Sequence, residues 1–271
     1  MTTDPIRDVP AHTVTWWSDR RHSACVLIPV INEGERIRSL LRRMHDLHIS
    51  DFADIILVDG GSTDGSLAQD AVAPLGIRGI VLKNGLGKLS AQLRCGYAVA
   101  LDAGYEEMVT IDGNDKDDPA AIPAFVAKLR EGYDFIQASR FVPGGLAENT
   151  PWIRDLAIRA IHAPVLSWAS GFHWTDTTQG FRGYSRKMLA DDRMHIFRPI
   201  FDRYELLAYI SYRAPRLGFR CIELPTCRRY PGSGKTPTKI SAIRGNWSLL
   251  TTLWKACTGQ YNPPKCTAAA S

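Results

Sequence analysis

Residues 24–66 decide the fold, and they read ACVLIPVINEGERIRSLLRRMHDLHISDFADIILVDGGSTDGS. The segment opens with a short apolar run that ends at Pro29 and Asn32, a pattern typical of a buried parallel strand entering a loop. Apolar residues then recur at helical spacing between Ile37 and Leu47. A second apolar run starts at residue 54 and leads into a glycine-rich turn. The sequence therefore predicts a strand–helix–strand unit with parallel strands.

The same alternation continues through the first half of the chain. Strands are predicted near 77–82, 107–111 and 134–138, and helices near 66–73, 88–103 and 122–131. Strands separated by such helices predict one α/β domain with a doubly wound, mostly parallel sheet and helices on both of its faces. We expect the ligand site at the carboxyl ends of the strands.

The second half is less regular, and we expect it to form a cover over one side of the ligand site. It predicts a helix over 151–169, a loop over 175–185, a helix near 204–217 and a strand at 220–224. Residues 1–22 lack periodicity and are expected to form an arm lying over the domain.

The composition narrows the class of protein. Among 271 residues there are 33 Lys or Arg and 28 Asp or Glu, so the net charge is +5. This excess suits an anionic substrate or an anionic membrane surface, and it is too weak to indicate nucleic acid binding. No apolar run is long enough to span a membrane and the N-terminus has no secretory signal, so a cytoplasmic location is expected. Six cysteines without C-x-x-C spacing are expected to be reduced.

The acidic stretch after the strand at 107–111 is the strongest candidate for chemistry. Residues 106–119 read EEMVTIDGNDKDDP. In an extended segment Asp112 and Asn114 point to the same side, so their oxygens could hold one hard cation together with substrate phosphates. The alternative is a polar turn in which Asp117 or Asp118 caps the helix that Pro119 opens.

The glycine-rich turn Asp59–Gly65 allows a ligand to approach the backbone closely. It has neither the lysine of a Walker loop nor dinucleotide-binding glycine spacing. A plain strand–helix turn capped by Asp64 is the alternative.

The motifs PVINE, VDGGSTDG, TIDGND, TDTTQGFRGYS and RRYPGSGK occur in this order between residues 29 and 235. In this combination the chain resembles family 2 glycosyltransferases of the GT-A fold, within the branch of dolichyl- and polyprenyl-phosphate sugar synthases. The resemblance implies a nucleotide-sugar donor, a divalent metal (Mg²⁺ or Mn²⁺) and inversion at the anomeric carbon. It divides the chain into an N-terminal arm (1–23), a GT-A glycosyltransferase domain (24–239) and a C-terminal amphipathic helix and tail (240–271).

The resemblance also assigns candidate residues. The metal ligands would be Asp112 and Asn114, with Asp115 as a substitute. Asp112 and Arg140 would act in catalysis, Arg140 by facing an acceptor phosphate. The candidate donor-binding residues are Pro29, Asn32, Glu33, Asp59, Gly61, Lys88, Asp112, Gly113, Asn114, Gln179, Arg228, Arg229 and Lys235. In the last group, Arg228, Arg229 and Lys235 belong to a late basic loop expected to close over the diphosphate.

Two positions depart from the usual family pattern. Gly60 stands where a second acid is common, which leaves the nucleotide base open. Asn114 and Lys116 alter the metal motif, which is usually D-x-D.

Further candidates come from the second half of the chain. Asp176, Asp202 or Glu205 would have to act as the base if the acceptor were a hydroxyl. The alternative for Asp202 and Glu205 is a pair of acids favoured at a helix N-terminus. A cluster of arginines could bind phosphates, and its members are Arg140, Arg154, Arg159, Arg182 and Arg186. The histidines His162, His173 and His195 lack ligand spacing and are read as structural.

These observations favour an inverting, metal-assisted hexosyl- or acetylhexosaminyltransferase that moves a sugar from a UDP- or GDP-sugar to a polyprenyl phosphate. Transfer to a soluble hydroxyl acceptor in natural-product or polysaccharide biosynthesis and a non-catalytic nucleotide-sugar binding module stay open. So does a homo-oligomer. The segment from Ile243 places Trp247, Leu250 and Trp254 on one helical face. Packing on the domain is favoured, while peripheral contact with the inner face of a membrane through this helix stays the alternative.

Overall fold

The computed structural model describes residues 7–230 and 244–264. Its strands are β1 (His12–Trp16), β2 (Ala24–Val30), β3 (Asp54–Asp59), β4 (Ile77–Lys83), β5 (Glu107–Thr110), β6 (Phe135–Ser139), β7 (Leu146–Glu148), β8 (Arg182–Ser185), β9 (Cys221–Pro225) and β10 (Cys227–Arg229). Its α-helices are α1 (Glu35–Asp46), α2 (Gln69–Val72), α3 (Leu89–Asp102), α4 (Ile122–Arg130), α5 (Trp152–Ala157), α6 (Ala163–Ser170), α7 (Arg186–Leu189), α8 (Glu205–Arg216) and α9 (Arg244–Cys257). A π-helical segment, η4 (Ile158–His162), joins α5 to α6 without a break.

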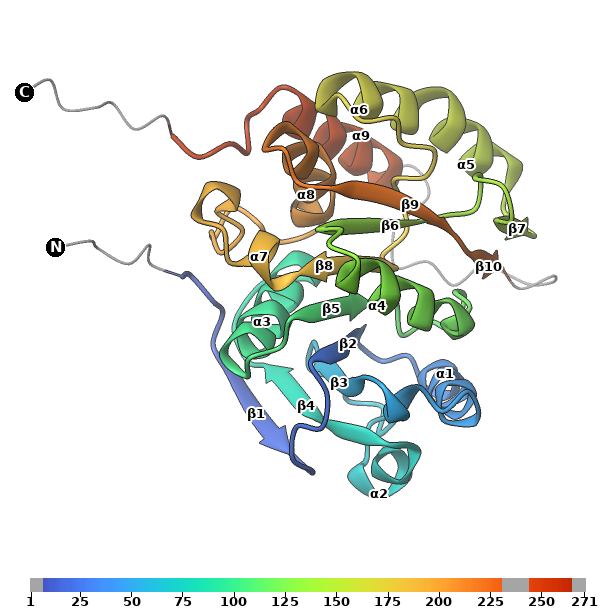
Figure 1. The fold of residues 1–271 in the computed structure, drawn as a ribbon, viewed down its shortest axis with the longest axis vertical. Helices are drawn as coiled ribbons and strands as arrows, with labels where there is room; N and C mark the ends of the chain where they lie inside the picture. Colours follow the sequence, from blue (N-terminus) through green and yellow to red (C-terminus); the bar gives the residue numbers. More distant parts are fainter. Residues whose placement is uncertain (1–6, 231–243, 265–271) are drawn as a thin grey trace, which may run out of the picture.

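A central sheet organises the molecule, with the strand order β1-β4-β3-β2-β5-β8-β6-β9 (Figure 1). Strands β4, β3, β2 and β5 run parallel, as do β6 and β9. Strand β1 pairs antiparallel at one edge, and β8 lies antiparallel between β5 and β6. Strands β7 and β10 form a separate parallel pair. This arrangement brings the carboxyl ends of β2, β3, β4 and β5 to one edge of the sheet.

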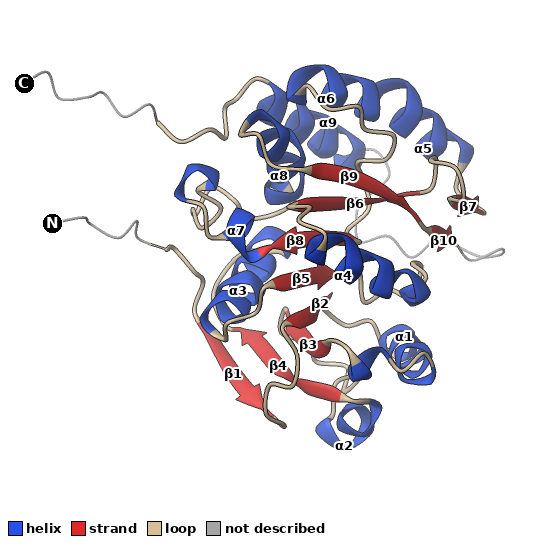
Figure 2. Ribbon diagram, viewed as in Figure 1, coloured by secondary structure: helices blue, strands red, loops and turns tan. Residues whose placement is uncertain are grey.

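Helices lie on both faces of the sheet (Figure 2). A hydrophobic core lies between the sheet and the helices on each face. Helices α1, α2 and α4 bury one face, and the alternation along β2 shows why. Val26 and Ile28 belong to this core, while Cys25 and Leu27 belong to the other one.

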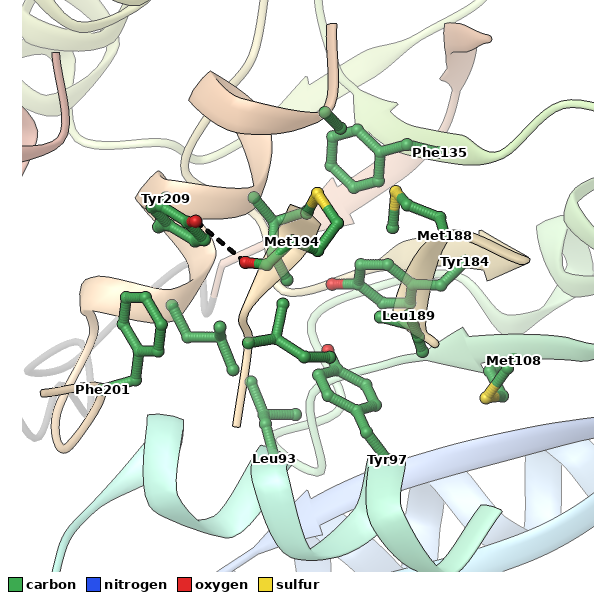
Figure 3. Packing of buried hydrophobic residues seen from close by; sticks show 14 of the residues in the cluster. Leu93, Tyr97, Met108, Phe135, Tyr184, Met188, Leu189, Met194, Phe201 and Tyr209 are labelled. Atoms are coloured by element: carbon green, nitrogen blue, oxygen red, sulfur yellow. Dashed lines mark hydrogen bonds between the residues drawn. The ribbon is translucent and has the colours of Figure 1, made fainter. Parts of the chain in front are cut away.

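The second core lies under α3, α6, α8 and α9. Figure 3 shows Leu93 and Tyr97 of α3 pointing toward Tyr184 of β8 and the residues after it. The Tyr209 hydroxyl donates a hydrogen bond of 2.8 Å to the Met194 carbonyl. Large apolar side chains of this kind each contribute about 1.5–3 kcal/mol when fully buried, so this core anchors the second half of the chain to the first.

The predicted α/β fold with a mostly parallel sheet and helices on both faces is confirmed. Two segments differ from the prediction. Residues 12–16 of the expected arm form an edge strand, and residues 182–185 of the expected loop form β8. The RGYS sequence of β8 has no apolar alternation, and its pairing with β5 and β6 makes it a strand, so tertiary context decides its structure.

Within residues 7–230 and 244–264, no helix is both long and apolar enough to cross a bilayer. The five cysteines in these ranges form no disulfide with one another.

Candidate active site

A cavity of ≈570 Å³ lies at the carboxyl edge of β2, β3, β4 and β5. The second half of the chain closes it with α5, η4, the segment 177–182 and α8. The described lining holds seven Lys or Arg side chains and two carboxylates, Glu33 and Asp112. Such an excess of positive charge in a concave site attracts anionic ligands.

The glycine-rich turn is braced against the β2–α1 loop beside this cavity. The Asp59 carboxylate accepts hydrogen bonds from the backbone N–H groups of Gly61 (3.1 Å) and Ser62 (2.8 Å). The Asn32 side-chain oxygen accepts from the Thr63 N–H at 2.8 Å, and Asn32 itself has φ 49°, a conformation that asparagine tolerates. Asp59, Asn32 and Gly61 therefore hold the shape of the turn, while Gly60 faces the cavity.

Asp112 lies at the centre of the site, just after β5. Its side chain is 22% exposed, and Asn114 Nδ2 is 3.5 Å from its Oδ2 atom. Gly180 packs so closely against the Asp112 carboxylate that a Cβ atom at this position would collide with it. The loop before β8 thus approaches the Asp112 carboxylate closely, a contact between distant parts of the chain that β8 creates by pairing with β5.

Arg228 of β10 joins Asp112 to a second, fully buried carboxylate. Its guanidinium lies 3.3 Å from Asp112 Oδ2 and 2.5 Å from Asp117 Oδ2. Burial raises the pKa of Asp117 to about 6, although the charge of Arg228 works in the opposite direction. Within the described residues Asp117 Oδ1 has no hydrogen-bond partner. We call Asp112, Asp117 and Arg228 the open cluster, since Asp112 faces the cavity.

Arg140 and Asp176 form a second cluster, which we call the sealed cluster. Their side chains are 1% and 0% exposed, and two hydrogen bonds of 2.7 and 3.1 Å join them. Burial alone would raise the pKa of Asp176, but the bonds from Arg140 and Gln179 lower it below its usual range. Neither residue lines the cavity. The structure therefore places Arg140 and Asp176 in a buried pair outside the cavity lining, and their roles at an acceptor phosphate and as a base stay predictions.

The other two candidate bases also have structural partners. The Glu205 carboxylate accepts hydrogen bonds from the backbone N–H groups of Asp202 (3.1 Å) and Arg203 (2.6 Å) at the start of α8. Asp202 lies beside Gly87, and its backbone carbonyl accepts from the Lys88 N–H at 2.8 Å. Both carboxylates lie outside the cavity lining. The helix-terminus interpretation describes Glu205.

Several cavity residues were not predicted as site residues. Lys83 is the last residue of β4 and lies at the carboxyl edge of the sheet. The predicted strand near 77–82 already indicated this position for Lys83. His162 was read as structural, yet it lines the cavity and its Nδ1 atom is 3.0 Å from Thr177 Oγ1. Burial lowers the pKa of His162 to about 4, so it is neutral at pH 7. Further lining residues that were not predicted include Arg36, Gln92 and Tyr204. Of the arginines predicted to bind phosphates, Arg154 and Arg182 line the cavity, whereas Arg140, Arg159 and Arg186 do not.

The structure brings seven of the seventeen predicted site residues that it describes into the cavity lining. The predicted residues that line the cavity are Pro29, Glu33, Lys88, Asp112, Gly113, Asn114 and Arg228. Those that lie outside its lining are Asn32, Asp59, Gly61, Asp115, Arg140, Asp176, Gln179, Asp202, Glu205 and Arg229. Lys235 lies outside the described residues.

The side chains at the site suit a divalent metal ion that takes most of its ligands from the bound substrate and from water. The Asp112 carboxylate and the Asn114 amide oxygen are hard ligands that suit Mg²⁺ or Mn²⁺ completed by water and phosphate. In the structure the Asn114 amide nitrogen faces Asp112 and its oxygen accepts from the Lys116 N–H at 3.3 Å, so the amide group would have to turn to bind the ion. No group of three or more His, Cys, Asp or Glu side chains in the described ranges could hold a metal alone. The Asp115 carboxylate pairs with Arg43 of α1 at 2.9 Å and lies outside the cavity lining, so its role as a substitute for Asn114 stays a prediction.

Comparison with known proteins agrees with this fold. The model of "Glycosyl transferase family 2" matches residues 25–193. A polyprenol monophosphomannose synthase of Mycolicibacterium smegmatis is 28% identical over 203 residues, which cover 74% of this chain and 75% of that protein. An undecaprenyl-phosphate mannosyltransferase of Micrococcus luteus is 29% identical over 220 residues, covering 73% and 80%.

Among solved structures, glucosyl-3-phosphoglycerate synthase from Mycobacterium tuberculosis, in complex with Mn²⁺, UDP and phosphoglyceric acid, superposes with a TM-score of 0.58. It is 18% identical, and the match covers 89% of this chain and 80% of that one. This likeness establishes the GT-A fold. With the family match spanning more than half of its length, the chain belongs to glycosyltransferase family 2.

Proposed function

We propose that this glycosyltransferase transfers a sugar, with inversion, from a UDP- or GDP-sugar to a polyprenyl phosphate, assisted by Mg²⁺ or Mn²⁺. The observation that carries the proposal is the cavity lining, in which seven cations surround two carboxylates. A sugar nucleotide diphosphate and an acceptor phosphate together supply the negative charge that such a lining needs. Relatives named for polyprenol- and undecaprenyl-phosphate sugar transfer support the acceptor class.

The state of the candidate bases favours a phosphate acceptor over a hydroxyl acceptor. A hydroxyl must lose its proton during transfer, so it needs a base near the reacting atoms. Asp176 is sealed against Arg140, and Glu205 binds backbone N–H groups. His162 does face the cavity, but a group with a pKa of about 4 is a weak base at pH 7. A phosphate acceptor is already ionised and requires none of these groups.

Different residues of the cavity would stabilise different parts of the reacting substrates. An acceptor phosphate oxygen forms a bond to the anomeric carbon while the bond to the diphosphate oxygen breaks on the opposite face, and that oxygen keeps the electron pair. Lys88, Lys116, Arg154 and Arg228 all line the cavity. In this proposal the first two and Arg228 stabilise charge on the diphosphate, and Arg154 of α5 binds the acceptor phosphate. A metal bound at Asp112 and Asn114 would neutralise further charge on the leaving diphosphate.

The test compares polyprenyl phosphate with polyprenol, the same lipid without its phosphate. We expect release of UDP or GDP and formation of a phospholipid-linked sugar only with polyprenyl phosphate, and reversible loss of turnover in EDTA. The anomeric configuration of the product, measured by NMR, tests inversion. Equal transfer to polyprenol would favour a hydroxyl-dependent reaction, and donor binding without release on any acceptor would favour the binding module. A thermal-shift panel of UDP- and GDP-sugars with either metal identifies the donor, since ligands of the native state raise the melting point.

A further inference from the structure

The ring of Tyr230, the residue that follows β10, lies among cationic side chains of the candidate active site. The Lys116 ammonium nitrogen is 5.1 Å from the centre of this ring, and the guanidinium carbons of Arg154 and Arg228 are each 5.8 Å from it. All three cations line the cavity, whereas Tyr230 is buried outside the lining, with 3% of its surface exposed. The face of an aromatic ring attracts a cation within about 6 Å, and the attraction is stronger away from water. We call Lys116, Arg154 and Arg228 the Tyr230 cations.

Backbone hydrogen bonds fix the place of Tyr230 between the segments that carry these cations. The Tyr230 N–H donates to the Glu148 carbonyl at 3.0 Å, and the Tyr230 carbonyl accepts from Asn149 Nδ2 at 3.1 Å. These bonds continue the β7–β10 pair, which lies at the same end of the molecule as α5 (Figure 1). The neighbouring Arg229 N–H donates to the Lys116 carbonyl at 2.8 Å. The ring is therefore held at the place where the Tyr230 cations converge.

Acids do not balance all of these cations within the described residues. Arg228 pairs with Asp112 and Asp117 in the open cluster. Arg154 forms no ion pair with a carboxylate in the described parts of the chain, and the Tyr230 ring offers its guanidinium a partner. Because like charges repel one another, Lys116 and Arg154 would tend to move apart in a cavity without ligand. The ring supplies an attraction that opposes this separation.

We propose that Tyr230 is a positioning residue, whose ring holds Lys116, Arg154 and Arg228 together before phosphate groups bind in the cavity. The diphosphate and the acceptor phosphate then meet cations that are already assembled, so less free energy is lost in ordering these side chains on binding. The proposal rests on the proposed function for the identity of the ligands. There Lys116 and Arg228 are assigned to the diphosphate and Arg154 to the acceptor phosphate, so the ring lies between the residues for the two groups.

Isothermal titration calorimetry with inorganic pyrophosphate and Mg²⁺ tests this role in the full chain. Tyr230→Leu removes the ring and should raise the Kd of pyrophosphate by about tenfold or more, because the ring no longer draws the cations together. Tyr230→Phe keeps the ring and should bind within about twofold of the wild type. The matched control is Tyr133→Leu, which removes a ring 4.4 Å from Arg220 and 5.9 Å from Lys128. These three residues lie outside the cavity lining, so the Kd of this variant should equal that of the wild type.

Fluorinated phenylalanines at position 230 test the ring without removing it. Fluorine withdraws charge from the face of the ring and keeps its shape, so the Kd of pyrophosphate should rise with increasing fluorination. A Kd that does not respond to fluorination would overturn the proposal, whether or not Tyr230→Leu folds.

The substitution Lys116→Met, made in the wild type and in Tyr230→Leu, measures the coupling between the ring and one of its cations. If the ring positions Lys116, loss of the ammonium group should raise the Kd by a smaller factor in Tyr230→Leu than in the wild type. Equal factors in the two backgrounds would contradict the positioning role.

Steady-state kinetics separate the positioning role from the proposed function. Tyr230→Leu should raise the KM for the donor and change kcat by less than about threefold, as expected when binding alone is weakened. A fall in kcat shared by Tyr230→Phe would show that the hydroxyl acts in the reaction, which overturns the role of the ring. Wild-type protein that binds pyrophosphate in a Tyr230-dependent way but transfers no sugar would contradict the proposed function and leave the positioning role supported. Sugar transfer by the wild type with an unchanged Kd in Tyr230→Leu would do the reverse.

Discussion

The open and the sealed clusters contain the same chemical groups in opposite settings. In the open cluster, Arg228 bridges Asp112, which is 22% exposed, and the buried Asp117. In the sealed cluster, Arg140 and Asp176 form hydrogen bonds with each other, and Thr178 and Gln179 bond to the pair. Both side chains have almost no exposed surface. We therefore expect an arginine–carboxylate pair of this protein to act in the reaction only where one partner reaches the cavity. The sealed pair instead holds the strand end after β6 against the loop that contains Thr178 and Gln179.

The largest expected effect is on stability, from Asp176→Ala. This change leaves the Arg140 guanidinium buried without its counterion, and breaking a buried pair typically costs about 3–5 kcal/mol. Urea denaturation measures the loss. The control is Asp155→Ala, which removes the partner of Arg159 from an exposed pair on α5, and such pairs contribute about 0.2–1 kcal/mol. Equal losses in the two variants would mean that burial does not distinguish the sealed cluster.

The second prediction concerns turnover and the open cluster. Asp112→Asn should lower turnover about 100- to 1,000-fold, the range found when one group that stabilises transition-state charge is removed. Its free energy of unfolding should change by about 1 kcal/mol or less, since the side chain is partly hydrated already. Steady-state kinetics and urea denaturation of the same preparation give both values.

Asp115→Asn is the matched control for Asp112→Asn. Asp115 is an aspartate of the same motif, but it pairs with Arg43 outside the cavity, so its replacement should leave turnover within about twofold of the wild type, a change of less than about 0.5 kcal/mol. Turnover that falls equally in both variants would return Asp115 to the metal site.

The two clusters also show how much of the site can be predicted from the sequence. The parallel unit at 24–66 and the position of Asp112 follow from apolar periodicity and from the rule that parallel strands present their carboxyl ends together. The side chains that pair with Asp112 and Asp176 cannot be predicted in this way. Asp112 meets Arg228 from a segment 116 residues later, and Asp176 meets Arg140 because β8 inserts between β5 and β6.

Asp117 and Asp118 illustrate the same limit at short range. Both positions suit a helix cap in the sequence, but only Asp118 caps, through the Ala120 N–H at 3.3 Å. Asp117 points inward to Arg228 instead. The choice depends on a strand, β10, that lies more than one hundred residues further along the chain.

The third prediction uses His162, which lies between the cavity and the sealed cluster. Burial lowers its pKa to about 4 although Asp176 works in the opposite direction. The folded state therefore prefers the neutral imidazole. Its contribution to stability is complete above the unfolded pKa of about 6.5 and is lost as the pH falls from there to about 4.

Wild-type protein should lose on the order of 2–3 kcal/mol more stability between pH 7 and pH 4 than His162→Gln does. Urea denaturation across this range measures the difference. His48→Gln removes an exposed histidine and should follow the wild-type curve. Parallel curves for wild type and His162→Gln would show that the cavity keeps His162 hydrated.

The smallest expected effect comes from Asp118→Ala, at the surface between the open cluster and α4. Asp118 accepts the Ala120 N–H and also lies 2.8 Å from Arg43, with its side chain 40% exposed. Loss of a cap costs about 1 kcal/mol, and turnover should not change because Asp118 lies outside the cavity lining. Asp118→Asn separates the two contributions, since asparagine caps as well as aspartate but cannot neutralise Arg43. We therefore expect Asp118→Asn to keep most of the stability that Asp118→Ala loses. If both variants lose turnover with their folds intact, the charged network around Arg43 affects the open cluster. Asp118 would then have to be counted, with Asp112, among the acids that influence the reaction.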